Sequence, residues 1–146
     1  MERILVLNGP NLNLLGERDP GHYGTRTLAE ICDDLRRRAE ALGVEVECFQ
    51  SNHEGELIDI IHRERGTSAG LIINPGALTH YSYAIRDAIE AVGLPAAEVH
   101  LSDIDSRESW RRNSVIRDVV VLTVSGKGPS GYLEALDELV RYIRKH

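Results

Sequence analysis

The sequence contains little of what disulfide frameworks, membrane anchors and signal peptides require. It has only two cysteines in 146 residues, Cys32 and Cys48, which lie in apolar-patterned segments without metal or redox spacing. We therefore expect two reduced core thiols. The longest aliphatic runs are far shorter than a bilayer span, and the four apolar residues between Arg3 and Asn8 are too few for a signal peptide. These absences predict a cytoplasmic protein with no membrane partner.

Positive charge and aromatic side chains are also scarce. The 17 Lys and Arg residues against 23 Asp and Glu give a net charge of −6, which disfavours nucleic acid as a partner. Aromatic residues make up 5%, few for the aromatic walls of a flavin-binding module. Hydrophobic residues at 42% and charged residues at 27% indicate a globular chain, and its length predicts a single domain, residues 1–146.

Short apolar runs alternate along the chain with segments of helical periodicity. The runs predict strands at residues 3–7, 44–49, 70–74, 96–101 and 118–125. The periodic segments predict helices at residues 28–42, 54–65, 81–92 and 132–145, with a short helix within 106–113. This alternation predicts an α/β fold, a flavodoxin-like three-layer sandwich with a five-stranded parallel sheet.

The connection between the first strand and the first helix is long for a compact domain. Residues 8–26 show no periodic pattern, and loops of this length are usually functional. We expect a lid at about residues 16–26. Thr27 and Glu30 have the spacing of a capping box, which predicts the start of the helix that follows.

Polar residues gather where the predicted strands end. In a parallel α/β sheet the ligand site lies beyond the carboxyl ends of the strands. The polar candidates at or after the ends of the first, third and fourth strands are Asn11, Arg18, Tyr23, Asn74, His80, Asp87, Glu98, His100, Ser102 and Arg111. Their convergence on one edge predicts a binding pocket there.

Two pairs among these residues suggest acid–base chemistry. Glu98 and His100 are two apart on a strand and share a face, so the carboxylate can fix the imidazole tautomer and support its protonated form for general acid catalysis. The other interpretation is a satisfied core histidine. Arg18 could lower the pKa of Tyr23, about 10 when free, by roughly one to three units. The alternative there is a solvated arginine and a tyrosine that anchors the loop.

Two other functions occur on the same fold and remain alternatives. A receiver-type signalling module needs acidic residues after the first strand and a phosphorylatable aspartate after the third, where this sequence has Asn8 and Asn74. A nucleotide-binding module is suggested by residues 126–131, which match G-x-G-x-x-G. That match falls in the last strand–helix turn and has no acidic residue about 20 positions on, so a tight turn explains it better.

Together, these segments resemble the type II 3-dehydroquinate dehydratases, the small cofactor-free lyases of the shikimate pathway. The resemblance runs from residue 3 to 143, with its strongest matches at residues 7–12, 15–18, 23–24, 50–54, 74–80, 98–102 and 107–111. It implies reversible dehydration of a small-molecule substrate, 3-dehydroquinate, to 3-dehydroshikimate through an enolate, a step of aromatic amino acid biosynthesis. It also implies a homo-oligomer, a dodecamer built as a tetramer of trimers.

The resemblance assigns catalytic roles to five residues. Tyr23 resembles the tyrosinate base that removes the proton α to the ketone, and Arg18 the cation that stabilises the tyrosinate. Asn11 is similar to the residue that holds a water against the enolate oxygen. His100 resembles the general acid that protonates the departing hydroxyl, with Glu98 orienting it.

The resemblance also implies a substrate-binding set. The backbone amides of Leu101 and Ser102 would hold the substrate carboxylate, which fits their predicted place before a short helix. Asn74, His80 and Arg111 resemble the partners of the ring hydroxyls. Asp87 matches a position that reaches in from a neighbouring subunit. The sequence departs from the common pattern at Leu78, Asp103, Asp105, Trp110 and Asn113, none of which belongs to the chemical step.

Metal and imine chemistry are both disfavoured by the residues themselves. His80, Asp87 and His100 lack the tight spacing of a metal-ligand set, so we expect no metal. The only two lysines are Lys127, in a glycine-rich turn, and Lys145, next to the last residue. Neither can lie desolvated on a strand as an imine-forming lysine should. The cofactor-free enolate route that the resemblance implies fits the residues present.

Overall fold

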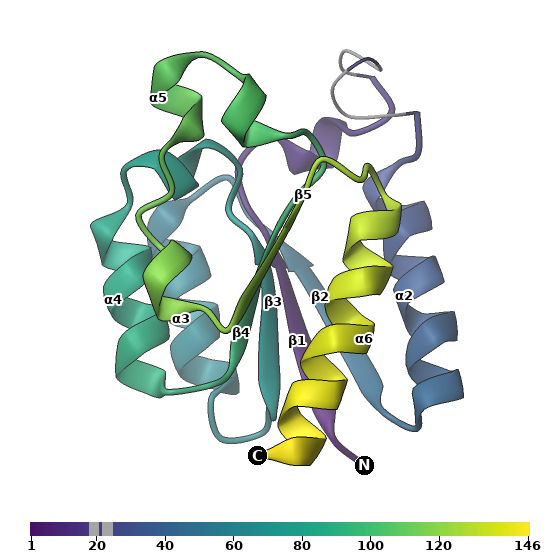
Figure 1. The fold of residues 1–146 in the computed structure, drawn as a ribbon. Helices are drawn as coiled ribbons and strands as arrows, with labels where there is room; N and C mark the ends of the chain where they lie inside the picture. Colours follow the sequence, from purple (N-terminus) through teal and green to yellow (C-terminus); the bar gives the residue numbers. More distant parts are fainter. Residues whose placement is uncertain (18–20, 22–24) are drawn as a thin grey trace.

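The fold is built on one parallel sheet. The structure, a computed structural model, describes residues 1–17, 21 and 25–146. Five strands lie in the order β2-β1-β3-β4-β5, and every neighbouring pair is parallel (Figure 1). Their bounds are β1 Arg3–Asn8, β2 Glu45–Gln50, β3 Gly70–Asn74, β4 Ala96–His100 and β5 Leu122–Ser125. The predicted flavodoxin-like α/β class is confirmed.

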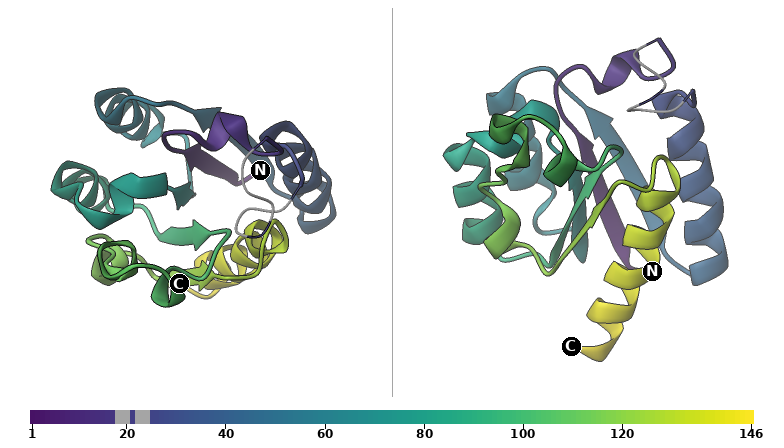
Figure 2. Two further views of the ribbon diagram at one scale, coloured as in Figure 1. Left: turned by 90° about the horizontal axis from the view of Figure 1, so that it is seen from above. Right: turned by 45° about the horizontal axis from the view of Figure 1, so that its top comes forward.

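Helices cover both faces of this sheet. The pair α2 (Leu28–Leu42) and α6 (Ser130–Lys145) lies on one face, and α3 (Glu54–Glu64) and α4 (Tyr83–Val92) lie on the other, as the view from above in Figure 2 shows. A four-residue helix, α5 (Ser109–Arg112), follows β4. The short 3-10 turns are η1 Leu12–Leu14, η2 Gly76–His80, η3 Ile104–Ser106 and η4 Arg117–Val119.

Each face of the sheet has its own hydrophobic core. Ile4 and Val6 of β1 belong to the cluster under α2 and α6, whereas Leu5 and Leu7 belong to the cluster under α3 and α4. All four side chains are fully buried. Successive strand residues point to opposite faces, so a strand covered on both sides is apolar without alternation. Each such side chain contributes about 1.5–3 kcal/mol by its burial.

The first helix begins and ends where the sequence predicts. The Thr27 side chain accepts from the Glu30 amide, and the Glu30 carboxylate accepts from the Thr27 amide, which completes the capping box. Gly43 ends the helix in the left-handed conformation, with φ 74°. The helix is therefore fixed at both ends by local chemistry.

The predicted strand at residues 118–125 is wrong in its first half. Residues 117–119 form a 3-10 turn, in which the Val119 amide donates to the Ile116 carbonyl, and β5 starts only at Leu122. Val119 and Val120 instead pack against the core under α3 and α4. A run of apolar residues that packs against the core from a turn has the same sequence pattern as a buried strand.

Three other predicted segments also need correction. The helix expected within 106–113 is only α5, preceded by the separate turn η3. The helix expected from residue 81 begins at Tyr83, because the Ser82 hydroxyl caps it by accepting from the Ile85 amide. Residues 8–26 are not wholly irregular, because η1 anchors their first part through Leu12, which is buried. The predicted lid includes residues 18–20 and 22–24, which lie outside the described residues.

The strand order determines where a binding site can form. The chain leaves β1 for β2 on one side and returns to β3 on the other, so the loops after β1 and β3 separate at the carboxyl edge. In doubly wound sheets this switch point opens a crevice for ligands. Both chain termini lie at the opposite end of the sheet (Figure 1).

Candidate functional site

A pocket of about 160 Å³ lies at this switch point. It is formed by the segments that follow β1, β3 and β4. Its lining residues are Pro10, Asn11, Leu12, Asn74, Gly76, Ala77, His80, His100, Leu101, Ser102, Ile104, Arg107, Trp110 and Arg111. Seven of the predicted site residues are among them: Asn11, Asn74, His80, His100, Leu101, Ser102 and Arg111.

The floor of the pocket depends on a close approach between two loops. The Gly9 amide donates to the Asn74 carbonyl at 2.8 Å, and a Cβ atom on Gly9 would lie 2.4 Å from the Pro75 carbonyl oxygen. Gly76 faces Pro10 from the other loop and has φ +62°. Gly9 has no room for a side chain, and Gly76 combines a left-handed backbone with a Cβ position only 3.0 Å from the Pro10 carbonyl oxygen, so glycine fits best at both.

Asn11 is held in an unusual conformation at the pocket wall. Its φ is 72°, and it is the one non-glycine residue with positive φ in the described part of the chain. Asparagine tolerates this region better than most residues. The Asn11 amide donates to Asn52 Oδ1 at 3.0 Å, and Gln50 Nε2 donates to the same oxygen and to the Gly9 carbonyl, both at 3.1 Å. Gln50 and Asn52, at the end of β2, thus position the predicted water-holding residue.

A buried network fixes Asn74. Its Nδ2 donates to the Tyr132 hydroxyl at 2.9 Å, and that hydroxyl donates to Asn8 Oδ1 at 2.7 Å. Asn74 Oδ1 accepts from the Gly76 amide at 3.1 Å. Because an amide nitrogen carries two hydrogens, a second N–H remains for a ligand. Burial, partly offset by the Asn74 hydrogen bond, raises the pKa of Tyr132, so its hydroxyl stays protonated.

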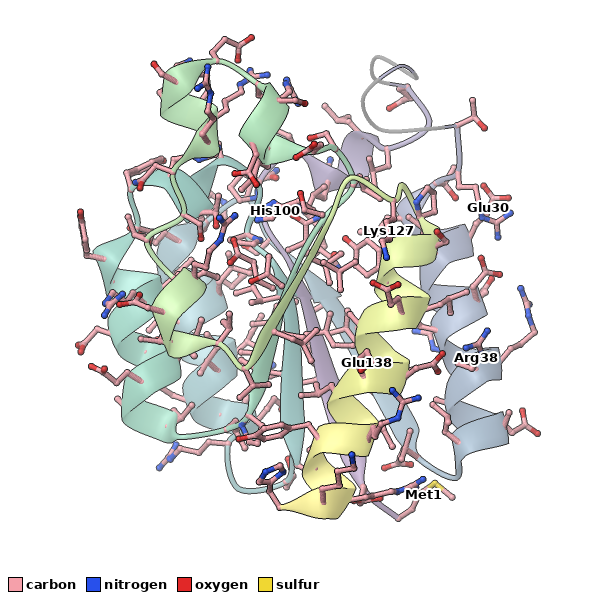
Figure 3. All side chains as sticks on the ribbon, viewed as in Figure 1. Met1, Glu30, Arg38, His100, Lys127 and Glu138 are labelled. Carbon is pink, nitrogen blue, oxygen red and sulfur yellow. The ribbon has the colours of Figure 1, made fainter. Side chains whose placement is uncertain are left out.

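The predicted Glu98–His100 pair is present. His100 Nε2 lies 2.6 Å from Glu98 Oε2, and both side chains are buried. The Thr79 and Ser114 hydroxyls each donate to the same carboxylate oxygen at 2.7 Å. His100 lies at the upper edge of the sheet in Figure 3, close to the end of β4.

The electrostatics of this pair define the direction of its hydrogen bond. Burial acts to raise the pKa of Glu98, but hydrogen bonds from His100, Thr79 and Ser114 outweigh it and hold the pKa below its ordinary value. An ionised carboxylate can only accept, so His100 Nε2 carries the hydrogen. Nδ1 is then the ring nitrogen left for the pocket, where it can donate a proton when the ring is charged.

His80 is oriented by the backbone of a distant segment. Its Nδ1 lies 2.6 Å from the Asn113 carbonyl oxygen, and Asn113 Nδ2 donates back to the His80 carbonyl at 3.2 Å. A carbonyl only accepts, so Nδ1 is protonated and Nε2 of the neutral ring is an acceptor. Trp110 contacts the ring edge-on at a centroid distance of 5.3 Å. His80 can therefore accept a hydrogen bond from a ligand hydroxyl.

The segment after β4 differs from its predicted role. The turn that follows Ser102 is only the three-residue η3, and Asp103 already caps it by accepting from the Asp105 amide. A helix amino end is therefore not what would favour an anion there. Arg107 supplies the positive charge instead, since its Nη1 donates to the Ser102 hydroxyl at 3.1 Å. The carbonyls of Leu101 and Ser102 accept from the amides of Gly128 and Gly126, which fixes this backbone.

Arg111 is held at the mouth of the pocket. Its guanidinium lies 4.6 Å from the Trp110 ring centroid, and its Nε is 3.1 Å from Glu108. Trp110 remains 55% exposed. The cation–π contact and the ion pair restrict the arginine while leaving it beside the pocket.

Three predicted site residues are not brought into this pocket by the described chain. Asp87 lies on the exposed face of α4, away from the pocket of its own chain. Arg18 and Tyr23 lie outside the described residues, so their pairing stays a prediction.

Sequence reasoning assigned no role to several residues that shape the site. Thr79 and Ser114 contact Glu98, Gln50 and Asn52 hold Asn11, and Arg107 contacts Ser102. All except Ser114 lie in segments matched by the resemblance, but neither their spacing nor their type indicated a role. Ser114 lies 16 residues from Glu98 and 35 from Thr79, and no local pattern connects the three.

Two structural features are absent from the described part of the chain. Within residues 1–17, 21 and 25–146, no three His, Cys, Asp or Glu side chains are grouped as metal ligands. Over the same residues, no helix has both the length and the apolar character to cross a bilayer.

The fold and pocket define an α/β protein with a polar binding site at the carboxyl edge of its sheet. A family model described as dehydroquinase class II matches residues 2–140. The 3-dehydroquinate dehydratase of Halothermothrix orenii is 53% identical over 145 residues, covering 99% of this chain and 98% of that protein. That of Bacillus cereus is 51% identical over 145 residues, with 99% of both chains covered.

Solved structures agree with the sequence relatives. The type II dehydroquinase from Butyrivibrio crossotus superposes with a TM-score of 0.93 at 43% identity, covering 95% of this chain and 97% of that one. The one from Propionibacterium acnes gives 0.92 at 40% identity, with 97% of both chains covered. The chain belongs to the class II dehydroquinase family. The predicted resemblance and enzyme class are confirmed, and the receiver and nucleotide-binding alternatives are not favoured.

Proposed function

We propose that the protein catalyses the reversible dehydration of 3-dehydroquinate to 3-dehydroshikimate through an enolate, as a cofactor-free step of the shikimate pathway. The observation that carries this proposal is the Glu98–His100 pair, with 2.6 Å between Oε2 and Nε2, at the pocket of a chain that belongs to this family. A buried, carboxylate-bound imidazole at a polar pocket is suited to proton donation.

The reaction divides into two proton transfers. A base removes the proton from the carbon α to the ketone, and the electron pair becomes the enolate. The enolate then re-forms the ketone and expels the β-hydroxyl, which leaves as water after His100 Nδ1 protonates it. His100 is left neutral with its hydrogen on Nε2, where Glu98 holds it. Asn11, at the pocket wall, orients a water that donates to the enolate oxygen.

Tyr23 is the proposed base, and Arg18 its activator. A free tyrosine has a pKa of about 10, so its ionisation at pH 7 costs about 4 kcal/mol. A guanidinium a few ångströms away would offset roughly 1.4–4 kcal/mol of that cost. Both residues match the family pattern, which supports this assignment.

The remaining polar residues are proposed to bind the substrate. Leu101 and Ser102 would hold the carboxylate with their backbone amides and the Ser102 hydroxyl, and the neighbouring Arg107 favours an anion there. Asn74 has a spare N–H and His80 an acceptor nitrogen for ring hydroxyls. Arg111 lines the same pocket.

The experiment that tests this proposal is a turnover assay on purified protein without added cofactor. We expect the enone absorbance of the product, undiminished by a chelator, and no inactivation when borohydride is added with substrate. Tyr23→Phe should lower turnover by at least about 100-fold while the protein stays folded. Near-normal turnover in that variant would remove Tyr23 as the base.

A further inference from the structure

The carboxylate of Glu98 is hydrogen-bonded on one side only. Oε2 accepts from His100 Nε2 at 2.6 Å and from the Thr79 and Ser114 hydroxyls at 2.7 Å each. Oε1 is also buried and has no hydrogen-bond partner among the described residues. Glu98 is completely buried, and an ionised group is costly there unless it has hydrogen-bond partners. The three donors to Oε2 offset that cost.

We infer that Thr79 and Ser114 are positioning residues for the general acid, which keep Glu98 ionised so that the shared hydrogen stays on His100 Nε2. This inference rests on the proposed function and deepens it, because it names what maintains the acid form of His100. Neither hydroxyl touches the reacting atoms; both act through Glu98.

The physical reason is a competition for one hydrogen. When His100 is charged, the hydrogen between Nε2 and Oε2 can belong to the imidazolium or to the carboxylic acid. Each hydroxyl that donates to Oε2 stabilises the carboxylate and not the acid, and such bonds to charged groups are strong. Without them the hydrogen would move to Oε2, leaving a neutral imidazole with its only hydrogen on Nδ1. A neutral imidazole is a far weaker acid than an imidazolium.

The two hydroxyls form one unit although they come from different segments. Thr79 lies in η2 and Ser114 in the loop after α5, and the Val115 amide donates to the Thr79 carbonyl at 2.7 Å. Their hydroxyl oxygens are 3.2 Å apart.

Within the described residues, three other titratable or charged side chains line the pocket that His100 lines. They are His80 from η2, Arg107 from the loop after η3, and Arg111 from α5. These groups are unchanged in the variants proposed here, so they act equally on the wild type and on each variant.

The kinetic test compares Thr79→Val, Ser114→Ala and the double variant with the hydroxyl-retaining controls Thr79→Ser and Ser114→Thr. Exchange of the α proton with solvent deuterium should stay within about three-fold of wild type, whereas loss of water should slow by roughly 10- to 100-fold in the double variant. KM should change little, and the alkaline limit of kcat should move down by about one pH unit. The controls should recover at least about a third of the wild-type rate.

An equal loss of both steps, or no loss of the dehydration step, would overturn the inference. Circular dichroism and the thermal midpoint check that each variant is folded. If Thr79→Val unfolds, Ser114→Ala removes a single oxygen from a half-buried site and still carries the test.

A measurement without turnover separates this inference from the proposed function. In the NMR spectrum of the wild type, the buried Nε2 hydrogen of His100 should give a downfield resonance coupled to nitrogen. In the double variant this resonance should lose its nitrogen coupling or move upfield. An unchanged resonance contradicts the inference even in an active enzyme. A changed resonance in a protein that does not dehydrate 3-dehydroquinate contradicts only the proposed function.

Discussion

At the scale of single residues, the site works through the direction of a few hydrogen bonds. Glu98 is an acceptor because three donors converge on its Oε2, and His100 is consequently a donor on Nε2. The Asn113 carbonyl sets the opposite arrangement at His80, whose Nδ1 carries the hydrogen. Two histidines in one pocket thus present different chemistry to a ligand. His100 can donate a proton through Nδ1, and His80 can accept a hydrogen bond through Nε2.

The ionised state of Glu98 should appear in the pH dependence of stability. Its folded-state pKa is held below the ordinary value of 4.5, so it stabilises the fold above that pH, and the contribution is lost as pH falls through the lower folded value. Glu98→Gln removes the ionisable group. We expect it to lower the free energy of unfolding by about 1–3 kcal/mol at pH 7, with the difference shrinking below pH 4.5. Urea unfolding at a series of pH values measures it; a difference independent of pH would contradict an ionised Glu98.

Tyr132 should contribute to stability through its hydroxyl. It is fully buried and hydrogen-bonded to both Asn8 and Asn74, so Tyr132→Phe removes the partner of the buried Asn8 Oδ1 and of Asn74 Nδ2. We expect a loss of about 1–3 kcal/mol in the free energy of unfolding. Tyr83→Phe is the matched control, because Tyr83 is 68% exposed and its change should stay within about 0.5 kcal/mol. Equal effects of the two substitutions would show that the network is not stabilising.

At the scale of elements, the site depends on where strands end and on how the next loops approach one another. The pocket opens where the loops after β1 and β3 diverge, and those loops touch at Gly9 and Pro75 before they part. Gln50 and Asn52 at the end of β2 support the wall at Asn11. Three adjacent strand ends therefore act as one platform.

The close approach at Gly9 can be tested by adding one carbon. Gly9→Ala would place its Cβ 2.4 Å from the Pro75 carbonyl oxygen, so the two loops must separate. We expect a loss of at least about 2 kcal/mol in the free energy of unfolding. In variants that remain folded, dehydration activity should also fall.

The control is Gly55→Ala in the first turn of α3, where a Cβ meets nothing within 4 Å and helix propensity favours alanine by about 0.5–1 kcal/mol. A Gly9→Ala protein as stable and active as Gly55→Ala would contradict this account of the platform.

The sequence predicted those elements whose determinants are local. The capping box at Thr27 and the end of β3 at Asn74 follow from neighbouring residues, and so does the shared face of Glu98 and His100. The predicted start of β5 was wrong because Val119 and Val120 bury their side chains against the core under α3 and α4 without forming a strand.

The parts of the site that escaped prediction depend on the tertiary fold. The hydroxyl of Ser114 meets Thr79 over a separation of 35 residues, and nothing near either residue indicates it. Asp103 caps the three-residue turn η3, which lies before the helix predicted within residues 106–113 and was not predicted itself. Arg107 was noticed only as part of a family match, because an arginine after a strand has no characteristic spacing to its serine partner.

At the scale of the whole molecule, a single chain does not bring every predicted site residue together. Asp87 lies on the outer face of α4, and the family resemblance implies that it acts on a neighbouring subunit's pocket. We propose that a second copy of the chain places its Asp87 at this pocket.

The predicted assembly can be measured directly. Light scattering after size-exclusion chromatography should give a mass about twelve times the chain's 16.3 kDa. Asp87→Asn should raise KM for the substrate more than it lowers kcat, because Asp87 is proposed to bind rather than to react. A fully active monomer, or an Asp87→Asn protein with an unchanged KM, would contradict the shared pocket.

The central claim is that His100, held by Glu98, donates the proton that lets the hydroxyl leave. The most direct measurement follows the two half-reactions of His100→Ala in deuterated buffer, with NMR detection of the substrate's α position and of product formation. The account predicts continued α-proton exchange while dehydration slows by about 100- to 10,000-fold. If exchange and dehydration are lost together in the folded variant, or if both persist, His100 is not the general acid.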